Sequence, residues 1–210
     1  MEATKQRVFD RSGGHLALDF VNTVGGMRPH RAREYLPGYS DLIAFALQTG
    51  CLSAGQAERL AEEARSRPSD AQAALEEARA LREAMHRVFL ARVQHERPAP
   101  ADLDALNAVL GRALSHRRLT AGDGCCALGW DEAASLDAPW WPVVAAAADL
   151  LASDVDLARV RVCAGSEAGA CGWLFLDRTK ARTRRWCSMQ DCGNRAKARR
   201  HYAKVKSRTT

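Results

Sequence analysis

The chain has 210 residues, a formal net charge of +6 and a hydrophobic fraction of 47%. This length predicts one ordinary domain with a small addition, and this apolar fraction is enough for a packed core. No segment approaches the ~20 apolar residues of a membrane-spanning helix, and the first residues contain no apolar signal-peptide core. We therefore expect a cytoplasmic protein that has no membrane partner and keeps its thiols reduced.

Residues 1–155 are predicted to form a mainly α-helical domain with a short strand near its start. The segment 15–24, HLALDFVNTV, is rich in β-branched and aromatic residues, which favour a strand or another extended conformation. Gly and Pro residues in 25–38 then indicate a loop.

Five helices are predicted after this loop. Ser40 is the expected N-cap of the first helix and Gly50 its end, while Ser53 and Gln56 form a capping box for the second. Pro68 is expected to separate the second helix from the third. The predicted ranges are 41–50, 54–67, 70–95, a helix from 100 onward, and 139–152.

Apolar residues with a period close to 3.6 predict the buried faces of the two middle helices. They are Ala74, Ala78, Leu81, Met85, Val88 and Val93 in the third helix, and Leu103, Leu106, Val109 and Leu110 in the fourth. Residues 116–120 and 125–130 flank a Gly-rich turn and predict a β-hairpin. Core or interface positions are expected for the remaining cysteines and for three tryptophans, namely Cys51, Cys125, Cys126, Trp130, Trp140 and Trp141.

Four cysteines near the C-terminus have the spacing of a metal site. Cys163 and Cys171 form one pair, and Cys187 and Cys192 form a second pair roughly fifteen residues later. Two disulfides are the alternative, but thiols that stay reduced favour metal. Four thiolates leave no open position on Zn²⁺, so the sequence predicts a structural zinc site and not a catalytic one.

The span between the two pairs is predicted to fold back as a hairpin, with a strand at 173–176, a turn at 177–180 and a return strand at 182–186. A helix rich in Ala, Arg and Lys follows Gly193. This order of elements is that of a treble-clef-like zinc finger, which we assign to 156–210. Three apolar residues of the helix, Ala198, Tyr202 and Val205, are expected to pack against Trp173 or Trp186.

Positive charge is concentrated at this end of the chain. Residues 178–208 contain twelve Lys and Arg and one acid, a net charge of +11, whereas the rest of the chain carries −5. Such a basic end on a mildly acidic body indicates a nucleic-acid partner, and a basic helix favours the DNA major groove. The candidate DNA-binding residues are Asn194, Arg195, Lys197, Arg199, Arg200, His201, Lys204 and Arg208.

The C-terminal sequence from WLFLD to RRHYAK resembles the CGNR zinc-finger family, named for the residues that stand here as Cys192, Gly193, Asn194 and Arg195. The loop AGSEAGA between Cys163 and Cys171 is longer than the first knuckle expected for that family. The segment GGHLALDFVNTV, followed by YSDLIAFALQTGCLS, resembles the ABATE domain that accompanies this finger. The resemblance implies a mostly helical domain in proteins proposed to be stress-induced transcription regulators.

Asp19 and Asn22 are polar residues in an apolar segment, and with Arg31 they could line a pocket for a small-molecule effector. The alternative is that their side chains bond the backbone and are structural. No catalytic motif is present, so we do not expect an enzyme.

Taken together, the sequence predicts a transcription regulator that binds DNA through a structural zinc finger and a basic helix. The alternative is a small-molecule-binding or enzymatic N-terminal domain whose zinc tail contacts RNA or protein. The oligomeric state stays open, with a dimer among the options.

Overall fold

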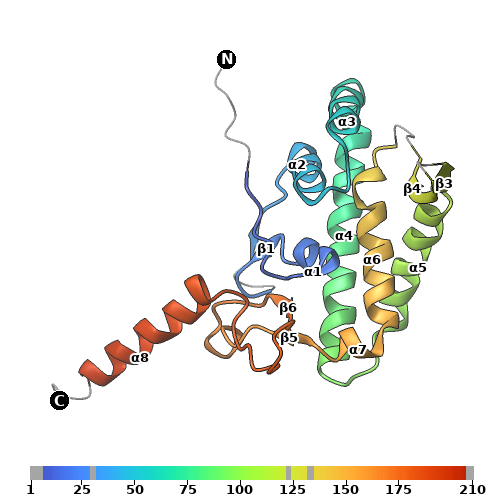
Figure 1. The fold of residues 1–210 in the computed structure, drawn as a ribbon. Coiled ribbons are helices and arrows are strands. Elements are labelled where there is room, and N and C mark those ends of the chain that lie inside the picture. The colour runs from blue at the N-terminus through green and yellow to red at the C-terminus, as the bar shows by residue number, and fades with distance from the viewer. Residues whose placement is uncertain (1–6, 29–31, 122–123, 132–134, 207–210) are drawn as a thin grey trace.

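The computed structural model describes residues 7–28, 32–121, 124–131 and 135–206. They form a helical body and a C-terminal four-cysteine unit from which the last helix projects (Figure 1), so the predicted mainly α fold class is confirmed. The helices are α1 Leu16–Val21, α2 Tyr39–Thr49, α3 Ala54–Ser66, α4 Pro68–Val93, α5 Pro100–Leu114, α6 Trp141–Ala152, α7 Asp154–Leu157 and α8 Asn194–Lys206. The strands are β1 Val24–Gly25, β2 Arg33–Glu34, β3 Arg117–Ala121, β4 Cys126–Trp130, β5 Val160–Val162 and β6 Leu174–Leu176, paired as β1–β2, β3–β4 and β5–β6.

The predicted strand at 15–24 is wrong, because most of it is the helix α1. His15 is the N-cap, and its Nδ1 accepts a hydrogen bond from the Ala17 N–H at 3.3 Å. The helix is buried on nearly every side, with Leu18 and Phe20 both fully inaccessible. A short segment buried all round loses the polar face that distinguishes a helix from a strand, so its composition alone was misleading.

Helix ends follow the predicted chemistry in part. Gly50 ends α2 in the left-handed conformation, with φ of 76°, and Ser53 and Gln56 form the predicted capping box of α3. Ser40 is not the N-cap of α2, because Gly38 takes that position and donates its N–H to the Asp41 carboxylate at 3.1 Å. Pro68 does not lie outside α4 but starts it, since the first turn of a helix needs no N–H from that residue.

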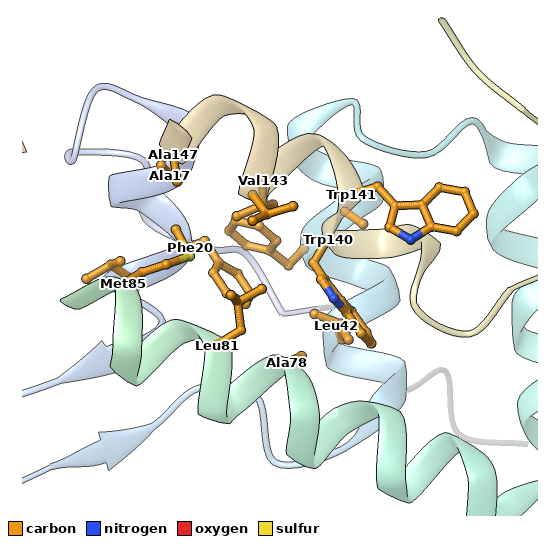
Figure 2. Packing of buried hydrophobic residues seen from close by; sticks show 14 of the residues in the cluster. Ala17, Phe20, Leu42, Ala78, Leu81, Met85, Trp140, Trp141, Val143 and Ala147 are labelled. Atoms are coloured by element: carbon orange, nitrogen blue, oxygen red, sulfur yellow. The ribbon is translucent and has the colours of Figure 1, made fainter. Parts of the chain in front are cut away.

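The core of the body lies where α1, α4 and α6 meet, and Figure 2 shows side chains of all three there. The predicted α4 stripe is largely confirmed, with four of its residues buried and Ala74 and Val93 partly buried against the core. The α5 prediction is wrong at Leu103, which is 37% exposed. Asp102 is buried instead, because Arg87 of α4 binds its carboxylate, with an Nη2–Oδ1 distance of 2.6 Å.

The β3–β4 hairpin is confirmed, with Leu119 opposite Leu128. It stands at the edge of the body, and both of these leucines are exposed. Trp140 and Trp141 are buried as predicted and Trp130 is half-buried. The predicted burial of Cys125 and Cys126 is wrong, because they lie on the exposed part of this hairpin, while Cys51 packs partly buried against the core.

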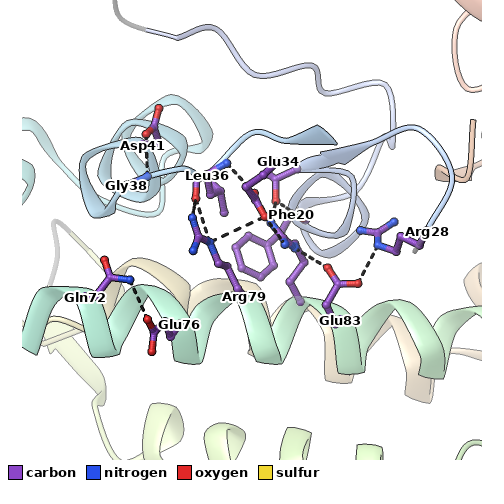
Figure 3. Close-up of polar contacts among 12 residues, drawn as sticks. Phe20, Arg28, Glu34, Leu36, Gly38, Asp41, Gln72, Glu76, Arg79 and Glu83 are labelled. Atoms are coloured by element: carbon purple, nitrogen blue, oxygen red, sulfur yellow. Dashed lines mark hydrogen bonds and ion pairs between the residues drawn. The ribbon is translucent and has the colours of Figure 1, made fainter. Parts of the chain in front are cut away.

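A polar network fixes the chain after α1 onto α4 (Figure 3). Arg82 is 3% exposed, and its guanidinium binds both carboxylate oxygens of Glu34 at 2.7 Å. Its Nη1 also contacts the Thr23 hydroxyl at 3.2 Å, and Arg28 pairs with Glu83 at 2.8 Å. A buried guanidinium needs such partners, and here they hold Thr23 and Glu34 against α4.

Candidate metal centre and basic helix

The strands β5 and β6 join the helical body to the cysteine cluster. They pair antiparallel, with Arg161 opposite Phe175. Successive side chains of a strand face opposite sides, so Leu174 and Leu176 enter the core of the body while Phe175 packs with the cysteines. The predicted return strand at 182–186 is wrong, because β6 pairs with β5. Asp177 instead closes a turn by accepting hydrogen bonds from the N–H groups of Thr179 and Arg184, both at 3.0 Å.

The four predicted cysteines converge on one point. Their Sγ atoms all lie within 4.8 Å of one another, and all four residues are buried. Sγ of Cys187 is 3.7 Å from that of Cys171 and 3.6 Å from that of Cys192. A tetrahedral ion with metal–sulfur bonds of about 2.3 Å separates its sulfurs by roughly 3.8 Å. The cluster therefore fits a metal ion, and these distances are far too long for disulfide bonds.

Each cysteine is positioned by its local structure. Cys163 follows β5 and Cys171 precedes β6, so the longer first loop still returns its second sulfur to the cluster. Gly165 lies inside that loop, where an added Cβ would come within 2.9 Å of the Cys171 Cβ. Cys192 lies in a tight turn at the start of α8, capped by the Ser188 hydroxyl, which accepts from the Asp191 N–H at 3.2 Å. The predicted placement of the second pair at a helix start is confirmed.

N–H donors surround the sulfurs. The backbone N–H groups of Gly165 and Cys187 each point to the Cys163 Sγ at 3.4 Å, and the Arg195 guanidinium donates to the Cys192 Sγ at 3.2 Å. Together with the thiols of Cys171 and Cys187, which donate to it, these backbone groups lower the pKa of Cys163. The pKa of Cys187 is raised, chiefly because its thiol hydrogen-bonds to the sulfurs of Cys163 and Cys171, and further by burial and by the negative charge of those sulfurs.

Backbone and side-chain hydrogen bonds tie the cysteine unit to the N-terminal segment. The Asn22 side chain donates its amide to the Leu174 carbonyl at 2.7 Å and accepts from the Leu174 N–H at 3.1 Å. The Trp173 indole donates to the Val24 carbonyl at 2.7 Å, and the N–H groups of Gly172 and Leu176 donate to Gly26 and Gly13, both at 2.8 Å. These contacts join residues about 150 positions apart, so no local sequence pattern predicts them.

The predicted packing of α8 is wrong. None of the described residues 194–206 is buried, and Tyr202 and Val205 are 72% and 50% exposed. Trp173 donates a hydrogen bond to the Val24 carbonyl, and Trp186 packs on the cysteine cluster. The five apolar residues among its thirteen, three of them alanines, bury too little area to hold a helix of this charge against the protein. Only its first turn is anchored, and the rest projects away from the body (Figure 1).

The helix carries most of the predicted DNA-binding residues. Arg195 contacts Cys192, and Asn194 donates to the Gln190 carbonyl at 2.9 Å, so these two belong to the anchored turn. Beyond that turn lie the exposed residues Lys197, Arg199, Arg200, His201 and Lys204. No acid occurs in 194–206. Arg208 lies outside the described residues.

Asp19 and Asn22 line a cavity of about 360 Å³ between α1 and the cysteine unit. Asn22 is 3% exposed, and the Leu174 backbone occupies both ends of its amide, which favours the structural interpretation of this residue. Burial raises the pKa of Asp19 to about 7, offset in part by Arg11 and by the N–H groups of Gly14 and Gly13. Arg31, the third predicted residue, lies outside the described residues.

The fold and site define a helical body joined to a small four-cysteine unit with a basic helix. Comparison with known families agrees. Residues 14–154 match the ABATE family, described as "Putative stress-induced transcription regulator", and residues 159–205 match the CGNR zinc finger. No curated protein matches the chain. The chain belongs to the ABATE family and carries a CGNR zinc finger, as the sequence resemblance predicted. Among the described residues, no helix is both long and apolar enough to cross a membrane.

Proposed function

We propose that the protein is a DNA-binding transcription regulator in which Zn²⁺, held by Cys163, Cys171, Cys187 and Cys192, fixes the base of a DNA-binding helix. Four thiolates suit Zn²⁺ and complete its coordination, so the ion would serve the structure and not a reaction. Side chains of α8 would contact base edges or phosphates of the DNA, and the N-terminal body would bind a small-molecule effector.

The observation that carries the proposal is the exposure of α8. A helix of thirteen residues is about 20 Å long, and this one presents cationic side chains without acidic neighbours on its own sequence. A like-charged surface held away from the body is unfavourable alone, and a polyanion removes that repulsion. An exposed α-helix of this size also fits the width of the DNA major groove.

The side chains divide by position along the helix. Asn194 and Arg195 lie at the anchored turn and Arg199 lies one turn beyond; these are the candidates for base edges, since Asn pairs with adenine and Arg with guanine. Lys197, Lys204 and Arg208 are the candidates for phosphate contacts. Each phosphate contact lowers the logarithm of affinity by about 0.9 per unit of log salt concentration.

The test is a salt titration of DNA affinity with zinc-loaded, full-length protein. Lys197→Ala should weaken binding to every duplex alike and flatten the salt slope by roughly one. Arg65→Ala is the matched control, because Arg65 is a 71% exposed cation on a helix of the body and should leave the slope unchanged. A folded, zinc-loaded protein with no DNA affinity at low salt would refute DNA binding. Preference for RNA over duplex DNA would support the alternative function.

A further inference from the structure

The cavity between α1 and the cysteine unit has the size of a small-molecule site. Its volume is about 360 Å³, within the range of roughly 300–1,000 Å³ typical of ligand pockets. One wall comes from the N-terminal segment and α1, with Phe9 and Asp19. The opposite wall comes from the finger, with Trp173 and three of the four clustered cysteines. Arg195, in the first turn of α8, also lines it.

A buried acceptor without a partner lies in the wall of this cavity. Asp19 is only 3% exposed, and its Oδ1 makes no hydrogen bond with any described residue. A buried polar atom left unpaired costs free energy that a bound donor would recover. Asn22, on the same wall, cannot supply that donor, because its amide is already bound to Leu174.

The charges around the cavity favour a cationic donor. The two arginines of its lining are already engaged, Arg7 with Asp41 at 3.4 Å and Arg195 with the Cys192 sulfur at 3.2 Å. Neither arginine pairs with Asp19, and the charge of Arg11 offsets the burial of its carboxyl group only in part. The cysteine wall adds negative charge, because a divalent cation held by four thiolates has a formal charge of about −2.

Aromatic side chains supply an apolar surface beside this charge. Tyr35 and Trp173 both line the cavity and are half-buried. The Arg7 guanidinium carbon lies 5.9 Å from the centre of the Tyr35 ring, so this ring already accommodates a cation. An aromatic face and a carboxylate together suit an organic cation with an apolar body.

We propose that this cavity is an effector site for a small organic amine or amidine with an apolar ring, bound through Asp19. Because both the body and the finger form its walls, an occupant changes how the finger is held against α1. Arg195 carries that change to the start of α8. This regulatory step rests on the DNA binding proposed above, whereas binding of the amine does not.

Fragment binding to zinc-loaded, full-length protein tests the site. Benzylamine and benzamidine are titrated by ligand-observed NMR, with benzyl alcohol and benzoate as the neutral and anionic counterparts. We expect saturable binding of the two cations and a preference for them of about tenfold or more, as a charged hydrogen bond provides. Equal binding of cationic and neutral probes, or no saturable binding of either cation, would overturn the proposal.

The variant test uses Asp19→Asn, which keeps the shape of the side chain. It should remove the preference for cations while zinc content and helical circular dichroism stay unchanged. Asp104→Asn is the matched control, because Asp104 is an exposed acid on α5 that does not line the cavity. Unaltered benzylamine affinity in folded Asp19→Asn would assign the binding elsewhere and refute the site.

DNA affinity measured with and without saturating benzamidine tests the regulatory step. A change of about fivefold or more is expected if the two sites are coupled. Unchanged DNA affinity, with benzamidine bound, would refute the coupling. Failure of the protein to bind DNA would refute the proposed function and leave the fragment result standing.

Discussion

Replacing Asn22 with alanine removes the side chain that joins α1 to the cysteine unit. Both backbone groups of Leu174 then lose their partner in a place where Leu174 itself is fully buried. Leaving a buried backbone group unpaired costs about 1–3 kcal/mol, and a value of about 1.5 kcal/mol for each group gives about 3 kcal/mol for the two. For a chain of this size, that lowers the melting temperature by about 6–12 °C.

The assay is a thermal melt in the presence of zinc, followed by circular dichroism. Asn107→Ala is the control, because Asn107 is exposed on α5 and its loss should change the melting temperature little. Asn22→Asp should be at least as damaging as Asn22→Ala, since it places a carboxylate oxygen against the Leu174 carbonyl oxygen. A melting temperature for Asn22→Ala within about 2 °C of the wild type would contradict this reasoning and return Asn22 to the candidate ligand contacts.

Two further predictions concern the metal and Asp19. Purified protein should contain about one zinc ion per chain. The Cys187→Ser variant should lose the zinc ion and melt at a lower temperature, whereas the control Cys125→Ser, at an exposed cysteine, should keep the ion. Zinc-free protein with disulfide bonds would contradict this prediction. The folded pKa of Asp19, about 7, lies above its ordinary value of 3.8. The contribution of Asp19 to the free energy of unfolding therefore falls as the pH rises from about 4 to 7, and it stays constant above pH 7. The melting temperature of Asp19→Asn relative to wild type should therefore rise from pH 5 to 7 and then stay constant, and a pH-independent difference would refute the shift.

Local patterns in the sequence predicted much of the fold and the whole cysteine cluster. Some features depend only on residues that are close together in the chain, so the sequence alone predicts them. They are the capping box at Ser53, the left-handed Gly50 and the β3–β4 hairpin. The cysteine spacing is informative for a different reason, since two close pairs of cysteines are typical of a metal site and of few other structures.

The sequence by itself therefore determined the family of the protein, the four cysteines that cluster and the basic character of its last helix. Only the tertiary structure decided that most of 15–24 is a buried helix, that α8 projects from the body, and that β6 pairs with β5. The physical reason is common to all three. Each depends on what surrounds a segment and not on the residues within it; beside α1, for example, Asn22 is bound by Leu174, about 150 residues away in the chain.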